Sequence, residues 1–171
     1  MTTRLDRLPI HPASAPSAEG WELRVEGLVT TSLALSLEAL AARPFVELHA
    51  DFLCEEGWEV SGLRWEGVPL DALLAEAAPA PAARFVGVGS GDFVSVIPLE
   101  DIAPMGAILA LRLDGEPLPP ENGGPLRLAF AAGACYQSVK WVDRLIVTET
   151  ADGETARETA RARLAQNREE R

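Results

Sequence analysis

The sequence is poor in the side chains that most often bind metals or act as nucleophiles and bases. It has two cysteines and two histidines in 171 residues. Cys54 and Cys135 lie far apart and match no zinc, CxxC or haem-attachment spacing, so we expect free thiols. His11 falls in the proline-rich N-terminal tail, so His49 is the one histidine expected within the domain. This scarcity excludes a recognisable Ser/His/Asp arrangement.

Long apolar runs and a basic surface are also missing. No stretch approaches the roughly 20 apolar residues that span a bilayer, and residues 1–18 contain no apolar segment typical of a secretory signal. The whole net charge of −11 lies within residues 21–150, and such an acidic surface repels nucleic acid and anionic membranes. The sequence therefore predicts a cytoplasmic protein that binds neither nucleic acid nor membrane.

The patterns that are present predict a β-rich domain. Alternation of apolar and polar residues indicates strands, and turn residues separate them. Strands are predicted at 21–29, 45–54, 84–97 (a hairpin), 108–113, 125–130 and 139–147, with short helices at 36–44 and 70–77. The organisation predicted is a tail at 1–20, one domain at 21–150 and an exposed helix or tail at 151–171. The fold class is α+β, a mixed sheet with a few short helices.

Cys54 is the most informative single residue. It ends the extended apolar run 45–54, and Gly57 then turns the chain sharply. Such a sulfur fits a metal ligand, a nucleophile or core filling, and residue statistics alone favour a buried structural cysteine. A catalytic pair with His49 is disfavoured, because a separation of five in a strand places the two side chains on opposite faces.

Seven short stretches follow one another in an order that carries a resemblance. They are WELRVEG (21–27), DFLCEEGW (51–58), RWEGV (64–68), FVSVIPL (93–99), LDGEPL (113–118), GGPLRL (123–128) and SVKWV (138–142). Together they resemble the molybdopterin-binding oxidoreductase domain of the sulfite oxidase family, in particular its short single-domain bacterial members. The resemblance implies that family's fold and a molybdenum–molybdopterin cofactor (Moco).

The resemblance also implies a site. Cys54 matches the cysteine that ligates molybdenum, and a soft thiolate suits such a metal. The family's pterin-holding loop matches the stretch that contains Gln137, Ser138 and Lys140, the only lysine of the chain. His49 and Arg127 are further candidates for contacts with the cofactor, although Arg127 equally fits a charge on a surface strand.

The implied activity is two-electron oxygen-atom transfer at a Cys-ligated molybdenum, on a small-molecule oxyanion or an S- or N-oxide. Three departures from the family pattern qualify it: Leu53, Gln137, and carboxylates at positions such as Glu55 and Glu56 after the cysteine. These carboxylates would repel sulfite, so sulfite itself is not the expected substrate. No haem motif is present, so a separate electron-transfer partner is expected. The alternative is a non-catalytic binding or interaction module with a degraded cofactor site.

Overall fold

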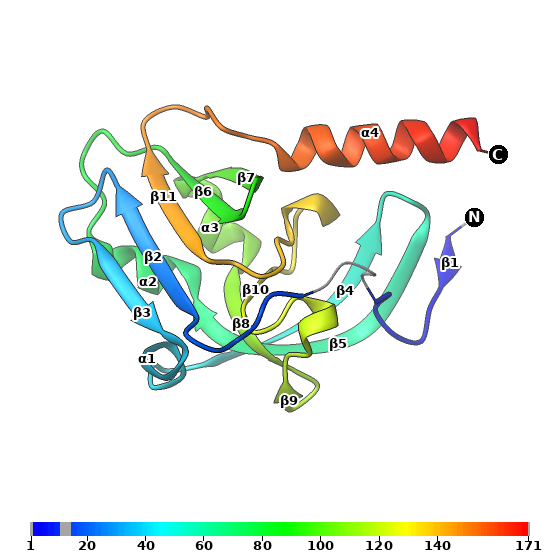
Figure 1. Ribbon diagram of the computed structural model, residues 1–171, viewed down its shortest axis with the longest axis horizontal. Helices are drawn as coiled ribbons and strands as arrows, with labels where there is room; N and C mark the ends of the chain where they lie inside the picture. Colours follow the sequence, from blue (N-terminus) through cyan, green and yellow to red (C-terminus); the bar gives the residue numbers. More distant parts are fainter. Residues whose placement is uncertain (1, 11–14, 171) are drawn as a thin grey trace.

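Two mixed β-sheets pack against each other, with short helices at their edges (Figure 1). The structure is a computed structural model that describes residues 2–10 and 15–170, so His11 lies outside the described residues. Four α-helices and two short 3-10 helices occur in this described part of the chain. The α+β, β-rich prediction is confirmed.

The first sheet has six strands in the order β1–β5–β8–β10, with β4 paired to β5 and β9 to β8. The strands are β1 (Thr3–Arg4), β4 (Val46–Cys54), β5 (Trp58–Pro69), β8 (Ile108–Leu113), β9 (Glu116–Pro117) and β10 (Arg127–Ala129). β4 and β5 form a long hairpin that turns at Gly57, whose φ is +93°. Glycine suits this left-handed turn. The turn places Cys54 at the tip of the hairpin.

The second sheet has five strands in the order β3–β2–β11–β6–β7, in which β2 and β11 are parallel. The strands are β2 (Glu22–Gly27), β3 (Leu33–Ser36), β6 (Phe85–Ser90), β7 (Phe93–Pro98) and β11 (Arg144–Thr148). The helices are α1 (Leu37–Ala41), α2 (Leu70–Ala77), α3 (Leu99–Met105), α4 (Ala156–Glu169), η1 (Pro120–Asn122) and η2 (Cys135–Gln137). The predicted hairpin at 84–97 is β6–β7.

Local signals in the sequence account for several of these boundaries. α1 begins after Ser36, whose hydroxyl accepts a hydrogen bond from the backbone N–H of Ala39 at 3.1 Å. α2 spans the predicted 70–77 and starts directly after Pro69. The structure adds β3, a four-residue strand before α1 that the sequence pattern did not indicate.

Two clusters of buried side chains form the core. The larger cluster lies between the two sheets and includes Leu23, Val86 and Leu109. The smaller cluster lies under the β4–β5 hairpin and includes Trp65 and Leu8. Leu8 reaches it because β1 pairs with the start of β5. The described part of the predicted N-terminal tail is therefore attached to the domain.

The predicted strand at 139–147 is wrong over its first half. β11 begins only at Arg144, and Ser138 to Asp143 form a loop. Trp141 has a φ of +54°, and its N–H donates to the carbonyl of Gly123 instead of to a neighbouring strand. The loop turns Lys140 toward the space below α4. No helix in the described part of the chain is both long and apolar enough to cross a membrane.

Candidate functional site

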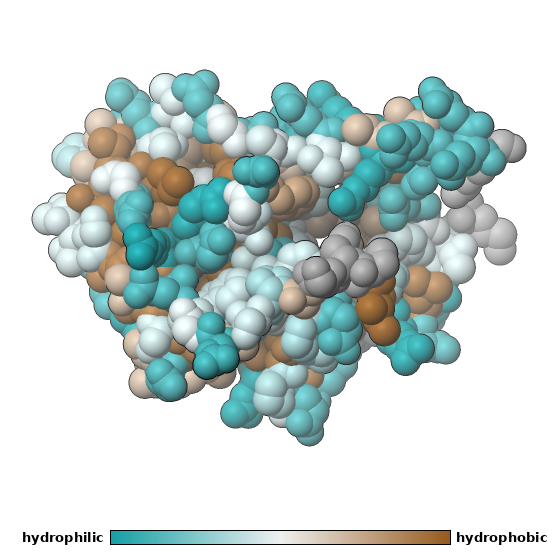
Figure 2. Space-filling model, in the orientation of Figure 1, coloured by the Kyte–Doolittle hydropathy of each residue, from teal (hydrophilic) through white to brown (hydrophobic). Residues whose placement is uncertain are grey.

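A cavity of about 430 Å³ lies between the tip of the β4–β5 hairpin, the 135–141 segment, residues 8–10 and α4. Figure 2 shows the surface hollowed below α4. The volume falls within the roughly 300–1,000 Å³ of small-molecule and cofactor sites. Its lining combines aromatic rings, two thiols, two carboxylates and several cations. Four of the predicted site residues line it: Cys54, Arg127, Ser138 and Lys140.

The two cysteines meet in the lining of this cavity. Cys54 ends β4 and Cys135 begins η2, and their sulfurs lie 3.7 Å apart. This distance is far longer than a disulfide bond, so both are free thiols. The shared hydrogen bond lowers the pKa of Cys135 to about 7, while the same contact and burial raise the pKa of Cys54. A metal binds only a deprotonated sulfur, so binding at Cys54 would release the proton that the raised pKa keeps on this thiol.

Carboxylates border the thiol pair, as the sequence indicated. The Cys54 Sγ lies 3.8 Å from Glu56 Oε2, and Glu55 also lines the cavity. The indole N–H of Trp58 donates to the same Glu56 oxygen at 3.4 Å. These contacts hold the negative charge of Glu56 beside the sulfur.

Arg127 is a buried cation in the lining of the same cavity. Its side chain, which belongs to β10, lies between the rings of Phe52 and Trp65, 5.2 and 5.3 Å from their centres. The residue is 3% exposed, and burial lowers its pKa to about 10. No carboxylate pairs with it among residues 2–10 and 15–170. A buried cation without a counter-ion is costly, and an anionic ligand would relieve that cost. The alternative of a surface strand charge is therefore wrong.

Lys140 adds a second cation. It lies in the loop before β11, and its Nζ is 5.9 Å from the centre of the Trp141 ring. Burial, and after it the positive charges of Arg127 and of Arg163 in α4, lower its pKa to about 8. Lys140 therefore lies close enough to both arginines to be repelled by them.

The two remaining residues of the pterin-loop prediction have different surroundings. Ser138 lines the cavity, accepts a hydrogen bond from Arg127 Nε at 3.0 Å and donates one to the Leu128 carbonyl at 2.7 Å. Ser138 therefore orients the guanidinium. Gln137 accepts a hydrogen bond from the Ala134 N–H at 2.8 Å, which stabilises η2, and it does not line the cavity.

His49 is not brought to the cavity. Its side chain is 67% exposed and contacts Glu47 on the outer face of β4. Side chains alternate along a strand, so Phe52 and Cys54 face inward while His49 and Leu53 face outward. Cys54 and His49 therefore do not form a pair.

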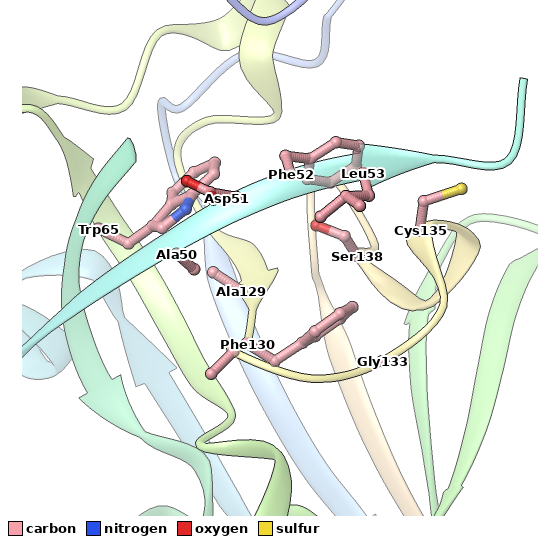
Figure 3. Close-up of a pocket in the computed structure, with 11 residues that line it drawn as sticks. Ala50, Asp51, Phe52, Leu53, Trp65, Ala129, Phe130, Gly133, Cys135 and Ser138 are labelled. Carbon is pink, nitrogen blue, oxygen red and sulfur yellow. The ribbon is translucent and has the colours of Figure 1, made fainter. Parts of the chain in front are cut away.

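A smaller cavity of about 70 Å³ adjoins the first one (Figure 3). It lies between β4 and the segment 129–133, and Trp65 and Phe130 contribute its walls. Cys135, Ser138 and Phe52 line both cavities. The two cavities thus adjoin at these three residues.

The donor set fits a cofactor that brings most of its own metal ligands. In the described ranges, no group of three or more His, Cys, Asp or Glu side chains could hold a metal ion. What the cavity offers is one pair of soft thiols and a group of unpaired cations. A metal bound here would need ligands from a larger anionic cofactor that the cations hold.

The family of the chain agrees with this site. The model of the oxidoreductase molybdopterin binding domain matches residues 10–155, and the chain belongs to this family. The resemblance to the sulfite oxidase family is confirmed. The matched region ends immediately before α4.

Relatives and a solved structure support the same assignment. The chain is 32% identical to the uncharacterized oxidoreductase YuiH of Bacillus subtilis, over 78% of this chain and 69% of YuiH. It is 31% identical to the putative protein-methionine-sulfoxide reductase subunit YedZ1 of Azospira oryzae, over 80% of this chain and 52% of that protein. The catalytic subunit MsrP of Gluconobacter oxydans, a protein-methionine-sulfoxide reductase, is 29% identical over 73% of this chain and 46% of MsrP. The chain thus spans about half the length of YedZ1 and MsrP.

The fold is similar to that of the sulfane dehydrogenase SoxCD from Paracoccus pantotrophus. The TM-score is 0.73 at 28% identity, over 82% of this chain and 41% of the SoxCD chain. The predicted fold family is therefore confirmed by structure as well as by sequence.

Among the thiols and cations that line the cavity, Cys135 and Arg163 were not predicted as site residues. Cys135 stands next to the stretch that resembles the pterin loop, and this position was a usable signal. Nothing in the sequence marked Arg163 as a site residue. It lies in a helix rich in charged residues, and only the packing of the helix decides which of them face the cavity.

Proposed function

We propose that the protein is a molybdopterin-dependent oxidoreductase that carries out two-electron oxygen-atom transfer, with Cys54 as the protein ligand of molybdenum. One observation carries the proposal: the Cys54 thiol and the cations Arg127 and Lys140 line a single cavity. This arrangement matches a ligand that combines a soft metal with an anionic group.

The cofactor, when bound, supplies the oxygen-atom transfer chemistry, and the protein holds and orients it. Cys54 would hold the metal through its thiolate. Arg127, oriented by Ser138, and Lys140 would bind the anionic part. Phe52 and Trp58, which stack with ring centres 5.5 Å apart, form an apolar wall that excludes water from the site.

The carboxylates beside Cys54 favour a neutral substrate. Of the predicted classes, an oxyanion such as sulfite would meet the charge of Glu56, whereas a neutral S- or N-oxide would not. The name of MsrP records an S-oxide substrate for that relative. Electrons would come from a separate partner protein, in keeping with the name of YedZ1 as a subunit. The cytoplasmic location stays a prediction.

Metal and pterin analysis tests the proposal. We expect about one molybdenum atom per chain, with pterin fluorescence, in protein purified from a host that makes the cofactor. Protein reduced through a viologen dye should then reduce a neutral S-oxide. Protein free of both metal and pterin, from a host that loads a control molybdoenzyme, would contradict the proposal.

The non-catalytic module predicts a different cavity. A degraded cofactor site should be filled by side chains, whereas this cavity is open from Cys54 to Lys140. The observation favours the enzyme. Protein that is fully loaded but turns over no oxyanion, S-oxide or N-oxide would reverse this preference.

A further inference from the structure

α4 lies outside the region that matches the family, yet it forms one wall of the cavity. The family match ends at residue 155, and α4 runs from Ala156 to Glu169. Ala160, Arg163 and Leu164 of this helix line the cavity. Their spacing of three and one places them on one face of the helix.

Contacts at both ends fix the position of α4. Before its first turn, the Thr155 N–H donates to the Val94 carbonyl at 3.0 Å and the Thr155 hydroxyl accepts from the Val94 N–H at 2.9 Å. Near its C-terminal end, Asn167 Nδ2 donates to Glu56 Oε1 at 3.2 Å. The helix therefore spans the gap between β7 and the tip of the β4–β5 hairpin (Figure 1).

A further contact places α4 against η2. The Arg157 guanidinium donates to the Tyr136 hydroxyl at 3.1 Å and lies 5.9 Å from the centre of its ring. η2 also carries Cys135, so the helix contacts the segment that holds the second thiol. α4 is thus held by contacts with β7, with the tip of the β4–β5 hairpin and with η2.

Arg163 adds a positive charge to the lining of the cavity. Its field lowers the pKa of Lys140, as does that of Arg127. Neither Arg163 nor Lys140 forms an ion pair with a carboxylate in the described part of the chain, although the domain is acidic. Like charges gathered without counter-ions oppose one another unless an anion lies between them.

We propose that α4 is part of the ligand site and that Arg163, with Arg127 and Lys140, binds a phosphate group of the ligand. A phosphate dianion accepts several charge-assisted hydrogen bonds and balances more than one cation. The inference rests on the proposed function for one point, that the phosphate belongs to the pterin cofactor. A free phosphate or another phosphate ester would have the same chemistry.

The test compares Arg163→Gln with Arg161→Gln. Arg161 lies on the same helix, is exposed and does not line the cavity, so its substitution makes the same change of charge elsewhere. Both variants should keep the circular dichroism spectrum and melting temperature of the wild type, because both side chains are exposed on a formed helix. Arg163→Lys keeps the positive charge, so it should retain most of the phosphate binding and pterin retention that Arg163→Gln loses.

The first arm measures inorganic phosphate binding to apoprotein by ³¹P line broadening. We expect Arg163→Gln to weaken binding about tenfold, while Arg161→Gln binds as the wild type does. The second arm measures pterin retained after gel filtration of loaded protein. We expect pterin to leave Arg163→Gln about tenfold faster.

The outcomes separate the two proposals. Equal phosphate binding and equal pterin retention in Arg163→Gln and wild type would overturn the role of Arg163, whether or not the wild type is loaded. Weakened phosphate binding in a protein that never contains pterin would support the phosphate site and contradict the cofactor. Equal losses in Arg163→Gln and Arg161→Gln would show a general effect of charge and would also overturn the proposal.

Discussion

Two groups of residues line the cavity, the thiols Cys54 and Cys135 (the thiol end) and the cations Arg127 and Lys140 (the cation end), and they differ in the charges around them. At the thiol end, Cys54 contacts Cys135 and Glu56, so its groups bond to one another. At the cation end, Arg127 and Lys140 have no carboxylate partner in the described residues. Arg127 donates hydrogen bonds to Ser138 and to the Asn122 carbonyl, so what the cations lack is a negative charge, which a bound anion would supply.

This difference predicts that one group of residues contributes mainly to binding and the other mainly to the reaction. A group that gains a missing partner on binding contributes more than one that exchanges existing partners. The cation end should therefore supply most of the binding energy, and the thiol end should decide which metal and substrate react. Variants at each end test this division.

The largest effect should follow from removing the ligand thiol. We expect Cys54→Ser to lose molybdenum almost completely, because a hydroxyl is a poor ligand for a soft site. Cys135→Ser should keep about half or more of the metal, since Cys135 is assigned no metal bond. Elemental analysis of the two variants, made side by side, measures this contrast.

Pterin content provides the control for the cysteine pair. Cys54→Ser should retain pterin better than metal, because the cation end remains intact. Loss of metal in Cys135→Ser with full loading of Cys54→Ser would exchange the roles of the two thiols.

A moderate loss of phosphate affinity should appear as rising pH removes the charge of Lys140. Its pKa of about 8 lies below the ordinary value of 10.5, so the free protein loses this charge as the pH rises through about 8. A bound anion favours the charged form and raises this pKa, so binding takes up a proton above pH 8. Phosphate affinity of the apoprotein should fall roughly threefold to tenfold between about pH 7 and pH 9.5.

Lys140→Arg tests the assignment of this titration. The guanidinium stays charged over the same range, so the affinity of this variant should change little with pH. Lys140→Gln should bind weakly at every pH. A wild-type profile that matches the flat profile of Lys140→Arg would contradict the pKa of Lys140 as the cause.

The smallest effect should come from neutralising the carboxylate at the thiol end. Glu56→Gln removes the charge beside Cys54 and keeps the size of the side chain, although its one amide oxygen replaces the two carboxylate oxygens that accept from Trp58 and Asn167. We expect kcat/KM for an anionic substrate such as sulfite to rise about threefold, with a neutral S-oxide almost unchanged. The rise should shrink at high salt.

Glu59→Gln is the matched control, because Glu59 lies in β5 close by and does not line the cavity. A similar rise in both variants would mean that the net charge of the domain, rather than Glu56, sets the preference.

The sequence predicted most of the fold because local signals agreed with the tertiary structure. Ser36, Pro69 and Gly57 specified a helix cap, a helix start and a turn, and each is found as expected. The strand predicted from residue 139 failed, because Trp141 takes a left-handed conformation imposed by the hydrogen bond to Gly123. A contact so distant in the chain leaves no periodic pattern.

For the site, the sequence by itself determined the family, the fold class and the position of Cys54, and it brought Lys140 and Arg127 into consideration. Only the tertiary structure decided that Arg127 is buried, that His49 faces outward and that Cys135 meets Cys54. It also decided that Arg163 of α4 faces the same cavity. The physical reason is that a site joins side chains from separate elements, and their distances depend on strand pairing and helix packing that residue order does not record.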